Sequence, residues 1–446
     1  MVPGTLVAEP GSVCCCTSMT TTTMLQHAKA LLMGSSTRWM GGASRRLANA
    51  ASMGYFRAEN CRVDDLAACC HSETAKCPSD FTARGAFHTA IQDEIVIYDS
   101  STLPWDDDVA LRQCEASVAE VLMHGSGVVV FRGAVEHATV DAASSVFWAL
   151  IAEQGGGSDR GDHFARAGAN SRLWNAVEKL AVRAPSLFVE YYANPTIALA
   201  SRAWLGPGYQ LSAQVNVVHP GGEAQAPHRD YHLGFRSNGE AEQYPAHVHT
   251  MCPTLTLQGA IAHSDMPAAT GPTLFLPHSQ KYAQGYLAWR SDEFKAYFAD
   301  NCVQLPLRKG DAVFFNPAVF HAAGSNSTAD VDRMANLLQI NSSFGRCMES
   351  IDRSRMSKAI YPALLAAATA GQGGGMGPAM LSNAIAAAAE ANPFPTNLDS
   401  DPPVGGLAPE SQAAILTRCL EEKLSVEEME QCLDEHQCRV RSHHVK

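Results

Sequence analysis

Short strand-like segments separated by turns dominate residues 204–345 and constrain the fold more than any other feature of the chain. Apolar and β-branched residues gather in these segments, and turn sequences such as Pro220-Gly221-Gly222 lie between them. The segments are 211–218, 254–262, 273–276, 312–315 and 333–341. Short strands with turn residues at each boundary are typical of double-sheet jelly rolls. We therefore predict a mostly β core with helical flanks (α+β), built as a double-stranded β-helix of the jelly-roll, cupin-like kind.

Composition divides the 446-residue chain into three predicted parts. Residues 1–53 are rich in Ser, Thr and Ala, and we expect either a transit peptide or a disordered extension outside the fold. Residues 54–350 should form the jelly-roll domain with N-terminal helices. Residues 351–446 should form a helical C-terminal extension that contains a Pro- and Gly-rich connector.

Charge, hydropathy and cysteine usage exclude several classes of protein. The formal net charge of -12 leaves no basic surplus, so we expect no binding to nucleic acid. No apolar run approaches the roughly 20 residues that span a bilayer, so we expect no transmembrane segment. The 14 cysteines contain no CxxC pair and are interpreted as reduced thiols of an intracellular soluble protein. A transit peptide would direct the protein to the mitochondrion, and without one we expect a cytoplasmic protein.

Two histidines and one carboxylate supply the ligand set of a mononuclear non-haem iron(II) site. His228 and Asp230 follow a strand and a glycine turn. Because residues i and i+2 of an extended segment point to the same side, both can face one metal while Arg229 points away. His321 follows the apolar strand 312–315 and should approach from the other side of the barrel. We predict His228, Asp230 and His321 as the metal ligands.

Arg333 lies twelve residues after His321, where the last strand begins. Its guanidinium can bind a carboxylate bidentately and keeps its charge in a semi-buried pocket. A co-substrate held by the metal at one end and by Arg333 at the other would be a short dicarboxylic keto acid, which fits 2-oxoglutarate. Three polar strand residues could also contact it, namely Gln214, Asn216 and Gln258. The alternative for these three is an outward, solvated orientation.

Four further residues are candidates for the substrate pocket. His232 lies four residues beyond His228 and is expected on the same face. Trp204 and Trp174 could pack on a substrate, although aromatic residues more often belong to the core. His163 lies in a glycine-rich loop that could act as a lid. The substrate pocket is therefore predicted to include His232, Trp204 and His163.

Two other histidine pairs compete with the predicted metal site. His263-Ser264-Asp265 is the stronger competitor, because it also follows a predicted strand. His247 and His249 have i, i+2 spacing, but no carboxylate follows them closely. We expect neither pair to bind a metal.

On these residues the chain resembles the phytanoyl-CoA dioxygenase family of Fe(II)/2-oxoglutarate-dependent oxygenases. The resemblance covers about residues 110–345, and it implies Fe(II), 2-oxoglutarate as co-substrate, and O2. His278 departs from the family pattern, in which Gly usually precedes the Ser of a hairpin motif. The matching elements are the strand 127–133, the His228-x-Asp230 pair, the hairpin 271–279, and the segment 321–326 followed by Arg333.

We predict an Fe(II)/2-oxoglutarate-dependent dioxygenase that hydroxylates a small-molecule or acyl-type substrate with release of succinate and CO2. The alternative is a non-catalytic jelly-roll relative that binds metal and a small ligand. A cupin-like metalloenzyme that uses no keto acid would leave Arg333 without a role. The C-terminal helices are expected either to pack on the barrel or to provide a surface for a partner or a homo-oligomer, with packing favoured.

Overall fold

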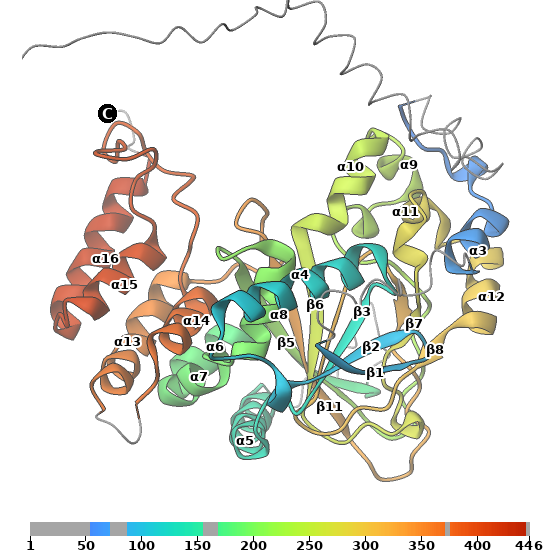
Figure 1. Ribbon diagram of the computed structural model, residues 1–446, viewed down its shortest axis with the longest axis horizontal. Helices are drawn as coiled ribbons and strands as arrows, with labels where there is room; N and C mark the ends of the chain where they lie inside the picture. The colour runs from blue at the N-terminus through green and yellow to red at the C-terminus, as the bar shows by residue number, and fades with distance from the viewer. Residues whose placement is uncertain (1–53, 72–86, 155–167, 371–374, 443–446) are drawn as a thin grey trace, which may run out of the picture. The chain divides into compact units, whose positions relative to one another are not determined.

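Two β-sheets of unequal size lie at the centre of the fold in the computed structural model (Figure 1). The larger sheet contains β1 (His88–Gln92), β2 (Ile95–Asp99), β3 (Val128–Arg132), β4 (Asn170–Leu173), β5 (Gln210–Val218), β6 (Thr256–Ala262), β9 (Ala312–Phe315) and β11 (Arg333–Asn341). The smaller sheet contains β7 (Leu274–Leu276), β8 (Val303–Gln304) and β10 (Phe320–Ala322). Their orders are β1-β2-β3-β9-β6-β11-β5-β4 and β10-β7-β8. Among the described strands, only β2 and β3 pair in parallel, and the arrangement confirms the predicted jelly roll.

The structure describes most of the chain outside its N-terminal segment. The described residues are 54–71, 87–154, 168–370 and 375–442. The predicted transit peptide or extension, residues 1–53, and the pocket candidate His163 lie outside them. The described residues from Tyr55 onward form one compact unit. None of the described helices combines the length and apolarity that crossing a bilayer requires.

The predicted strands of residues 204–345 are all present. β9 and β11 have the predicted bounds, and β5 and β7 differ from prediction by one residue at their starts. The predicted strand 254–262 starts only at Thr256, because residues Cys252–Leu255 form a 3-10 turn. Pro253 in that turn lacks the backbone N–H that a central strand needs.

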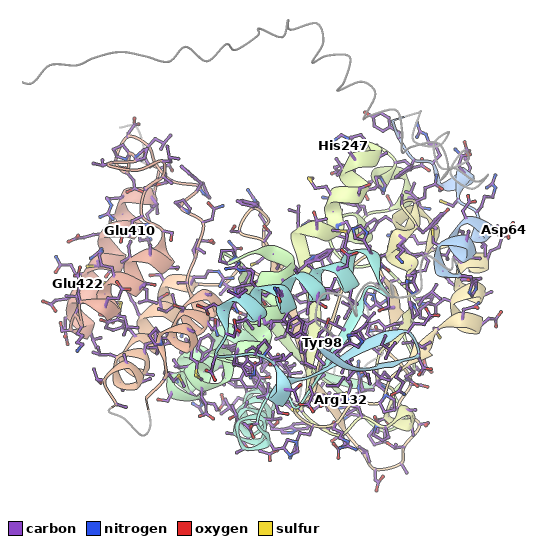
Figure 2. The ribbon with its side chains drawn as sticks, viewed as in Figure 1. Asp64, Tyr98, Arg132, His247, Glu410 and Glu422 are labelled. Atoms are coloured by element: carbon purple, nitrogen blue, oxygen red, sulfur yellow. The ribbon has the colours of Figure 1, made fainter. Side chains whose placement is uncertain are left out.

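The hairpin of β1 and β2 was missed by the sequence analysis. Its two turn residues, Asp93 and Glu94, both have positive φ, at 49° and 66°. A two-residue turn of this kind usually contains Gly or Asn, so the sequence carries no strong hairpin signal here. β2 nevertheless packs in the core, where Tyr98 stacks 5.1 Å from Phe131 of β3 (Figure 2).

Side chains of the central strands alternate between an apolar and a polar face, as the period of two requires. On β5 the apolar residues join the large hydrophobic core; they are Leu211, Ala213, Val215 and Val217. The intervening residues face the smaller sheet and are polar; they include Ser212, Gln214 and Asn216. The space between the sheets is closed by a second apolar cluster, in which Phe275 of β7 meets Phe315 of β9 at 5.0 Å.

Helices cover the apolar face of the larger sheet, and a second group lies around the smaller sheet (Figure 1). Before residue 350, the helices that contact the larger sheet or one another on its apolar face are α4 (Asp108–His124), α5 (His137–Glu153), α6 (Ala176–Arg183), α7 (Pro185–Tyr192) and α8 (Pro195–Leu205). The remaining helices before residue 350 are α3 (Val63–His71), α9 (Asn238–Ala241), α10 (Ala246–Met251), α11 (Gly285–Ala288) and α12 (Asp292–Asn301).

The C-terminal helices pack against the jelly-roll core, which is the favoured of the two expectations. They are α13 (Arg353–Thr369), α14 (Pro378–Ala388), α15 (Gln412–Glu421) and α16 (Val426–Val440). α14 contacts β5, and α13 contacts α6 and α7. Arg353 donates a hydrogen bond to the carbonyl oxygen of Leu211 in β5 at 3.0 Å. A capping box of Ser425 and Glu428 begins α16. A role of these helices in oligomerisation stays a prediction.

His263 belongs to the helix-side core and not to a metal site. Its Nδ1 lies 2.8 Å from Ser144 Oγ, and its Nε2 lies 2.8 Å from the Tyr191 hydroxyl. Asp265 is directed elsewhere and accepts a hydrogen bond from the backbone N–H of Lys309 at 2.9 Å. Burial lowers the pKa of His263 to about 3. A neutral imidazole with both nitrogens engaged has no lone pair left for a metal.

We predict that the free energy of unfolding falls less between pH 7 and pH 5 in the His263→Gln variant than in the wild type. The folded-state pKa of about 3 lies below the ordinary value of 6.5, so the unfolded chain takes up the extra proton first. Stability supplied by neutral His263 is therefore present above pH 6.5 and is lost as the pH falls toward 3. At pH 5 the loss is about 2 kcal/mol. Urea unfolding of both proteins at the two pH values measures it, and equal losses in both would contradict the prediction.

Candidate metal centre

The backbones of His228 and His321 pair directly and bring two imidazoles together. The N–H of His228 donates to the carbonyl oxygen of His321 at 2.9 Å, and the N–H of His321 donates back at 3.1 Å. This isolated antiparallel bridge joins the segment after β5 to β10 of the smaller sheet. The ring centroids lie 4.5 Å apart as a result. The predicted approach of His321 from the opposite sheet agrees with this geometry.

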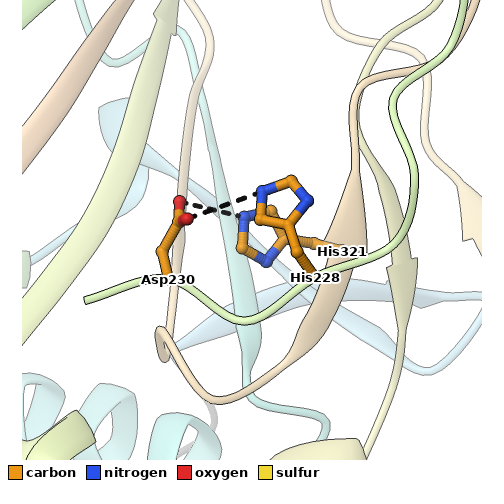
Figure 3. A group of neighbouring side chains, drawn as sticks. All are labelled: His228, Asp230 and His321. Carbon is orange, nitrogen blue, oxygen red and sulfur yellow. Dashed lines mark ion pairs between the residues drawn. The ribbon is translucent and has the colours of Figure 1, made fainter. Parts of the chain in front are cut away.

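Asp230 completes a group of three side chains that could hold a metal ion (Figure 3). Its Oδ1 lies 3.6 Å from Nε2 of His228, and its Oδ2 lies 3.5 Å from Nε2 of His321. One ligand atom from each residue lies within 4.8 Å of the others. Within the described ranges this is the one group of three or more His, Cys, Asp or Glu side chains with such spacing.

Hydrogen bonds outside the group orient each of the three side chains. Nδ1 of His228 lies 2.8 Å from the carbonyl oxygen of Ala226, and Nδ1 of His321 lies 3.0 Å from that of Val319. A proton on each Nδ1 leaves the Nε2 lone pair free to face the centre. Gln258 donates from Nε2 to Oδ2 of Asp230 at 2.7 Å.

The Asp230 carboxyl group stays ionised despite its surroundings. Burial by itself raises the pKa of Asp230. The charge of His228, the hydrogen bond and charge of His321, and the Gln258 amide together lower the pKa by more than burial raises it. The pKa therefore lies below its usual range. One anionic oxygen beside two imidazole nitrogens, with the remaining positions open, is the ligand set of non-haem Fe(II) sites.

A cavity of about 80 Å³ connects this group to Arg333. Arg333 is 4 % exposed and donates from Nη1 to the carbonyl oxygen of Gly271 at 2.9 Å. Burial, and then the nearby charge of Arg172, lower the pKa of Arg333 to about 10, so the group is charged at neutral pH. The cavity is lined by Arg172, Gln214, Asn216, Gln225, His228, Asp230, Gln258, Gly259, Ala260, Thr273, Phe315, His321, Ala323, Arg333, Leu337 and Gln339.

The charge of Arg333 has no acidic partner in the described part of the chain. No carboxylate there lies within ion-pair distance of it, and its Nε has no hydrogen-bond partner. A buried charge without a counter-charge costs several kcal/mol, even after the protein relaxes. An anion bound in the cavity would supply the missing counter-charge, so the far end of this cavity is suited to a carboxylate.

The three polar strand residues all point into the cavity, and the alternative of outward, solvated side chains does not apply. Gln214 accepts a hydrogen bond at Oε1 from Arg172 Nη1 at 2.7 Å. Gln258 holds Asp230, as described above. Oδ1 of Asn216 and Oε1 of Gln258 are buried without a hydrogen-bond partner. Buried polar atoms of this kind are available to a ligand.

A wider cleft of about 780 Å³ opens from the same metal-binding group. It shares five residues with the inner cavity, which are Gln214, Gln225, His228, Asp230 and Gln339. Aromatic and apolar side chains line much of the rest; they are Trp174, Phe235, Trp289 and Met348. Arg229, Arg236 and Arg290 also line it, whereas Asp230 is the one acidic residue among its described lining residues. The cleft therefore opens onto His228 and Asp230.

Two predicted pocket residues require correction. Trp204 packs on the helix side of the sheet, where its Nε1 donates to the carbonyl oxygens of Pro253 and Thr256 at 3.2 and 2.9 Å. His232 has positive φ and begins a 3-10 turn, so strand alternation ends before it. Its Nδ1 lies 3.6 Å from the Cys252 sulfur, and it does not line either cavity.

The remaining histidine pair lies on α10 and not on a strand. His247 is exposed at the surface (Figure 2), whereas His249 is buried with Nε2 3.0 Å from the carbonyl oxygen of Ala241. Their i, i+2 spacing therefore places them on different sides of a helix, and neither contributes to the metal-binding group.

Sequence reasoning missed Arg172, Gln225, Trp289 and Gln339. Arg172 lies on the short strand β4, paired with Asn216 of β5, and no turn or periodicity marked that strand. Gln339 is predictable in retrospect, because it follows Arg333 by six residues on one strand and so shares its face. Trp174, which was a candidate, does line the cleft.

Comparison with known proteins gives a family match. The family described as phytanoyl-CoA dioxygenase (PhyH) matches residues 123–335. A comparison with curated proteins gave no match. Among solved structures, the chain is similar to the non-heme alpha ketoglutarate dependent epimerase SnoN from nogalamycin biosynthesis, with 19% identity over 53% of this chain and 85% of that chain and a TM-score of 0.35.

A second solved structure is the non-heme alpha ketoglutarate dependent carbocyclase SnoK from nogalamycin biosynthesis. It shares 19% identity over 51% of this chain and 83% of that chain, with a TM-score of 0.36. Neither likeness assigns an activity to this chain. The family match is the more informative, because it includes His228, Asp230, His321 and Arg333.

We predict that Asp230→Ala weakens Fe(II) or Co(II) binding by more than about 100-fold, because loss of a ligand should exceed the 10- to 100-fold effect of losing an outer hydrogen bond. Anaerobic calorimetric titration of the folded protein measures the affinity. Asp265→Ala is the matched control, since Asp265 belongs to the competing His-x-Asp pair and should leave the affinity unchanged. Equal effects of the two substitutions would contradict the assignment.

Proposed function

Since residues 123–335 match the phytanoyl-CoA dioxygenase family, we propose that the protein is an Fe(II)- and 2-oxoglutarate-dependent dioxygenase that hydroxylates a small-molecule or acyl-type substrate. The observation that carries this proposal is the placement of a buried, acid-free guanidinium, Arg333, across one small cavity from two histidines and a carboxylate. A metal site alone would not need that arginine. A dicarboxylic keto acid would use both ends of the cavity.

The charged groups of the inner cavity favour a dianionic co-substrate. Apart from the histidines, its charged lining residues are Arg172, Asp230 and Arg333. The Asp230 carboxylate would be neutralised by the metal, whereas the Arg333 guanidinium has no acidic partner among the described residues. One carboxylate of 2-oxoglutarate would pair with Arg333, and the other would lie beside the metal. Guanidinium groups suit this task, because they stay charged and bind carboxylates bidentately.

The residues of the chain would hold the reacting groups and limit the access of water. His228, Asp230 and His321 would bind Fe(II), with Gln258 keeping Asp230 in place through its hydrogen bond of 2.7 Å. Apolar walls beside them, which include Ala260, Phe315 and Leu337, would exclude water from the inner cavity. With Fe(II), 2-oxoglutarate and O2 bound, the site supplies C–H oxidation coupled to formation of succinate and CO2.

The outer cleft is the proposed site of the primary substrate. It meets the metal-binding group at His228 and Asp230 and does not include Arg333, so a substrate bound there would reach the metal without occupying the arginine end of the inner cavity. Trp174 and Trp289 would contact an apolar or planar part of the molecule. Among the described lining residues, Asp230 is the one acidic group and arginines are present, which disfavours a cationic substrate.

We predict that purified protein with Fe(II), 2-oxoglutarate and O2 forms succinate, and that Asp230→Ala abolishes this reaction. Arg333→Ala should raise the KM for 2-oxoglutarate by at least about 100-fold, because losing a buried carboxylate pair costs about 3 kcal/mol or more. Succinate is measured by mass spectrometry with and without candidate substrates. Arg353→Ala is the control, since Arg353 is another buried arginine that donates to carbonyl oxygens outside the cavity. Unchanged turnover in Asp230→Ala or Arg333→Ala would refute the proposal.

Under anaerobic conditions, Fe(II) and 2-oxoglutarate together should produce a weak visible charge-transfer band that Arg333→Ala weakens. The band requires the keto acid to bind the metal, so it tests binding separately from turnover. A band without succinate formation would indicate the non-catalytic binding protein instead. Absence of any band in the wild type would count against both functions and favour a metalloprotein that uses no keto acid.

A further inference from the structure

Arg229 lies between two of the proposed metal ligands, yet its side chain turns away from the metal-binding group. Alternation along the extended segment sends His228 and Asp230 to one side and Arg229 to the other. Arg229 is 2 % exposed. Its Nη2 donates to the carbonyl oxygens of Ser279 and Tyr282, at 2.5 and 3.0 Å. The segment that carries two ligands is therefore attached to the turn that follows β7.

The same turn is attached to the segment that carries the third ligand. Ser279 accepts a hydrogen bond at Oγ from the backbone N–H of Phe320 at 2.8 Å, and it donates to the carbonyl oxygen of Leu276 at 2.6 Å. Phe320 immediately precedes His321. Ser279 thus contacts Arg229 through its carbonyl oxygen and Phe320 through its hydroxyl group, and so joins both ligand-bearing segments.

Aromatic contacts and close packing fix the guanidinium in this position. Its carbon atom lies 4.9 Å from the ring centre of Phe320 and 5.2 Å from that of Tyr286. Gly285 faces it so closely that a Cβ atom there would lie 1.9 Å from the guanidinium carbon. Any side chain at residue 285 would therefore displace Arg229.

Stability alone does not explain a cation at this position. Burial lowers the pKa of Arg229 to about 10, so the group remains charged at neutral pH. No carboxylate in the described residues lies within ion-pair distance of it. An apolar side chain of similar length would avoid the desolvation cost, and such replacements are often neutral or stabilising. What an apolar side chain could not do is hold two carbonyl oxygens at a set distance.

We propose that Arg229 and Ser279 act as a clamp that sets the position of the His228–Asp230 segment relative to His321. Arg229 is then a positioning residue for the metal centre, and Gly285 provides the space that the clamp requires. This inference rests on the proposed metal site, but not on the identity of the substrate. It predicts that weakening the clamp lowers metal affinity while the inner cavity and its arginines remain intact.

The test measures Co(II) affinity and the visible spectrum of bound Co(II) in the full-length protein, without 2-oxoglutarate. We expect Arg229→Met to weaken Co(II) binding by about 10- to 100-fold, the range observed when outer hydrogen bonds to metal ligands are lost. The Co(II) spectrum should change as well, because the ligand geometry changes. Arg229→Lys keeps the charge and a donor, so its affinity should lie between those of the wild type and Arg229→Met.

Two further variants separate positioning from folding. Arg353→Met removes a buried arginine that donates to carbonyl oxygens of residues that line neither cavity, and it should leave Co(II) affinity within about 2-fold of the wild type. Ser279→Ala should weaken Co(II) binding by a smaller factor than Arg229→Met. In the double variant, the fold-loss of Co(II) affinity should be smaller than the product of the fold-losses of the two single variants. If Arg229→Met does not fold, Ser279→Ala and Arg229→Lys carry the test.

Three results would overturn the clamp. Unchanged affinity and an unchanged Co(II) spectrum in folded Arg229→Met, with normal binding by the wild type, would refute the clamp alone. An equal loss of affinity in Arg353→Met would show a general effect of destabilisation and would also refute it. Absence of Co(II) binding by the wild type would refute the proposed function together with the clamp.

Discussion

Alternation of side chains along β6, β11 and β5 is the constraint on which the rest of the structure depends. These neighbouring strands place Leu257, Leu338 and Val215 in the core beneath the helices, and they place Gln258, Gln339 and Gln214 in the inner cavity. A shift of one residue in any pairing would exchange the two faces, so the apolar face determines the register. The register in turn determines which polar groups face a ligand. Arg333 reaches the cavity for this reason, because it shares the face of Gln339 on β11.

Within this sheet architecture, the backbone pairing of His228 with His321 fixes the geometry of the metal-binding group. A side chain can sample several rotamers, whereas two backbone hydrogen bonds of 2.9 and 3.1 Å fix the separation of the two segments. Each imidazole then needs only one further hydrogen bond, from its Nδ1, to direct Nε2 toward Asp230. The hydrogen bond from Gln258 to Asp230 links this group to the face of β6 that the register has already selected. Backbone pairing thus places the ligands, and side-chain hydrogen bonds orient them.

Much of the barrel and of the metal-binding group could be predicted from the sequence, because both depend on short-range patterns. Apolar and β-branched segments bounded by turn residues identified β5, β9 and β11, and i, i+2 spacing placed His228 and Asp230 together. The hairpin of β1 and β2 was missed because Asp93 and Glu94 occupy left-handed conformations without glycine. His232 was misplaced because the extended segment ends at Asp230, which spacing does not reveal. Arg172 was missed because its role comes from pairing of β4 with β5, a long-range contact.

Two buried arginines near the site, Arg229 and Arg333, have different surroundings. The difference distinguishes a residue that supports the fold from a residue that faces a ligand cavity. Arg229 donates from Nη2 to two carbonyl oxygens and lies against two aromatic rings, although its Nε has no hydrogen-bond partner. Arg333 lines a cavity together with Arg172, whose charge adds to the cost of burying it. Replacing Arg333 by an apolar residue would relieve that cost in the free protein. Arg333 is therefore suited to binding an anion and does not maximise the stability of the free protein. By linkage, a bound anion would stabilise the folded state.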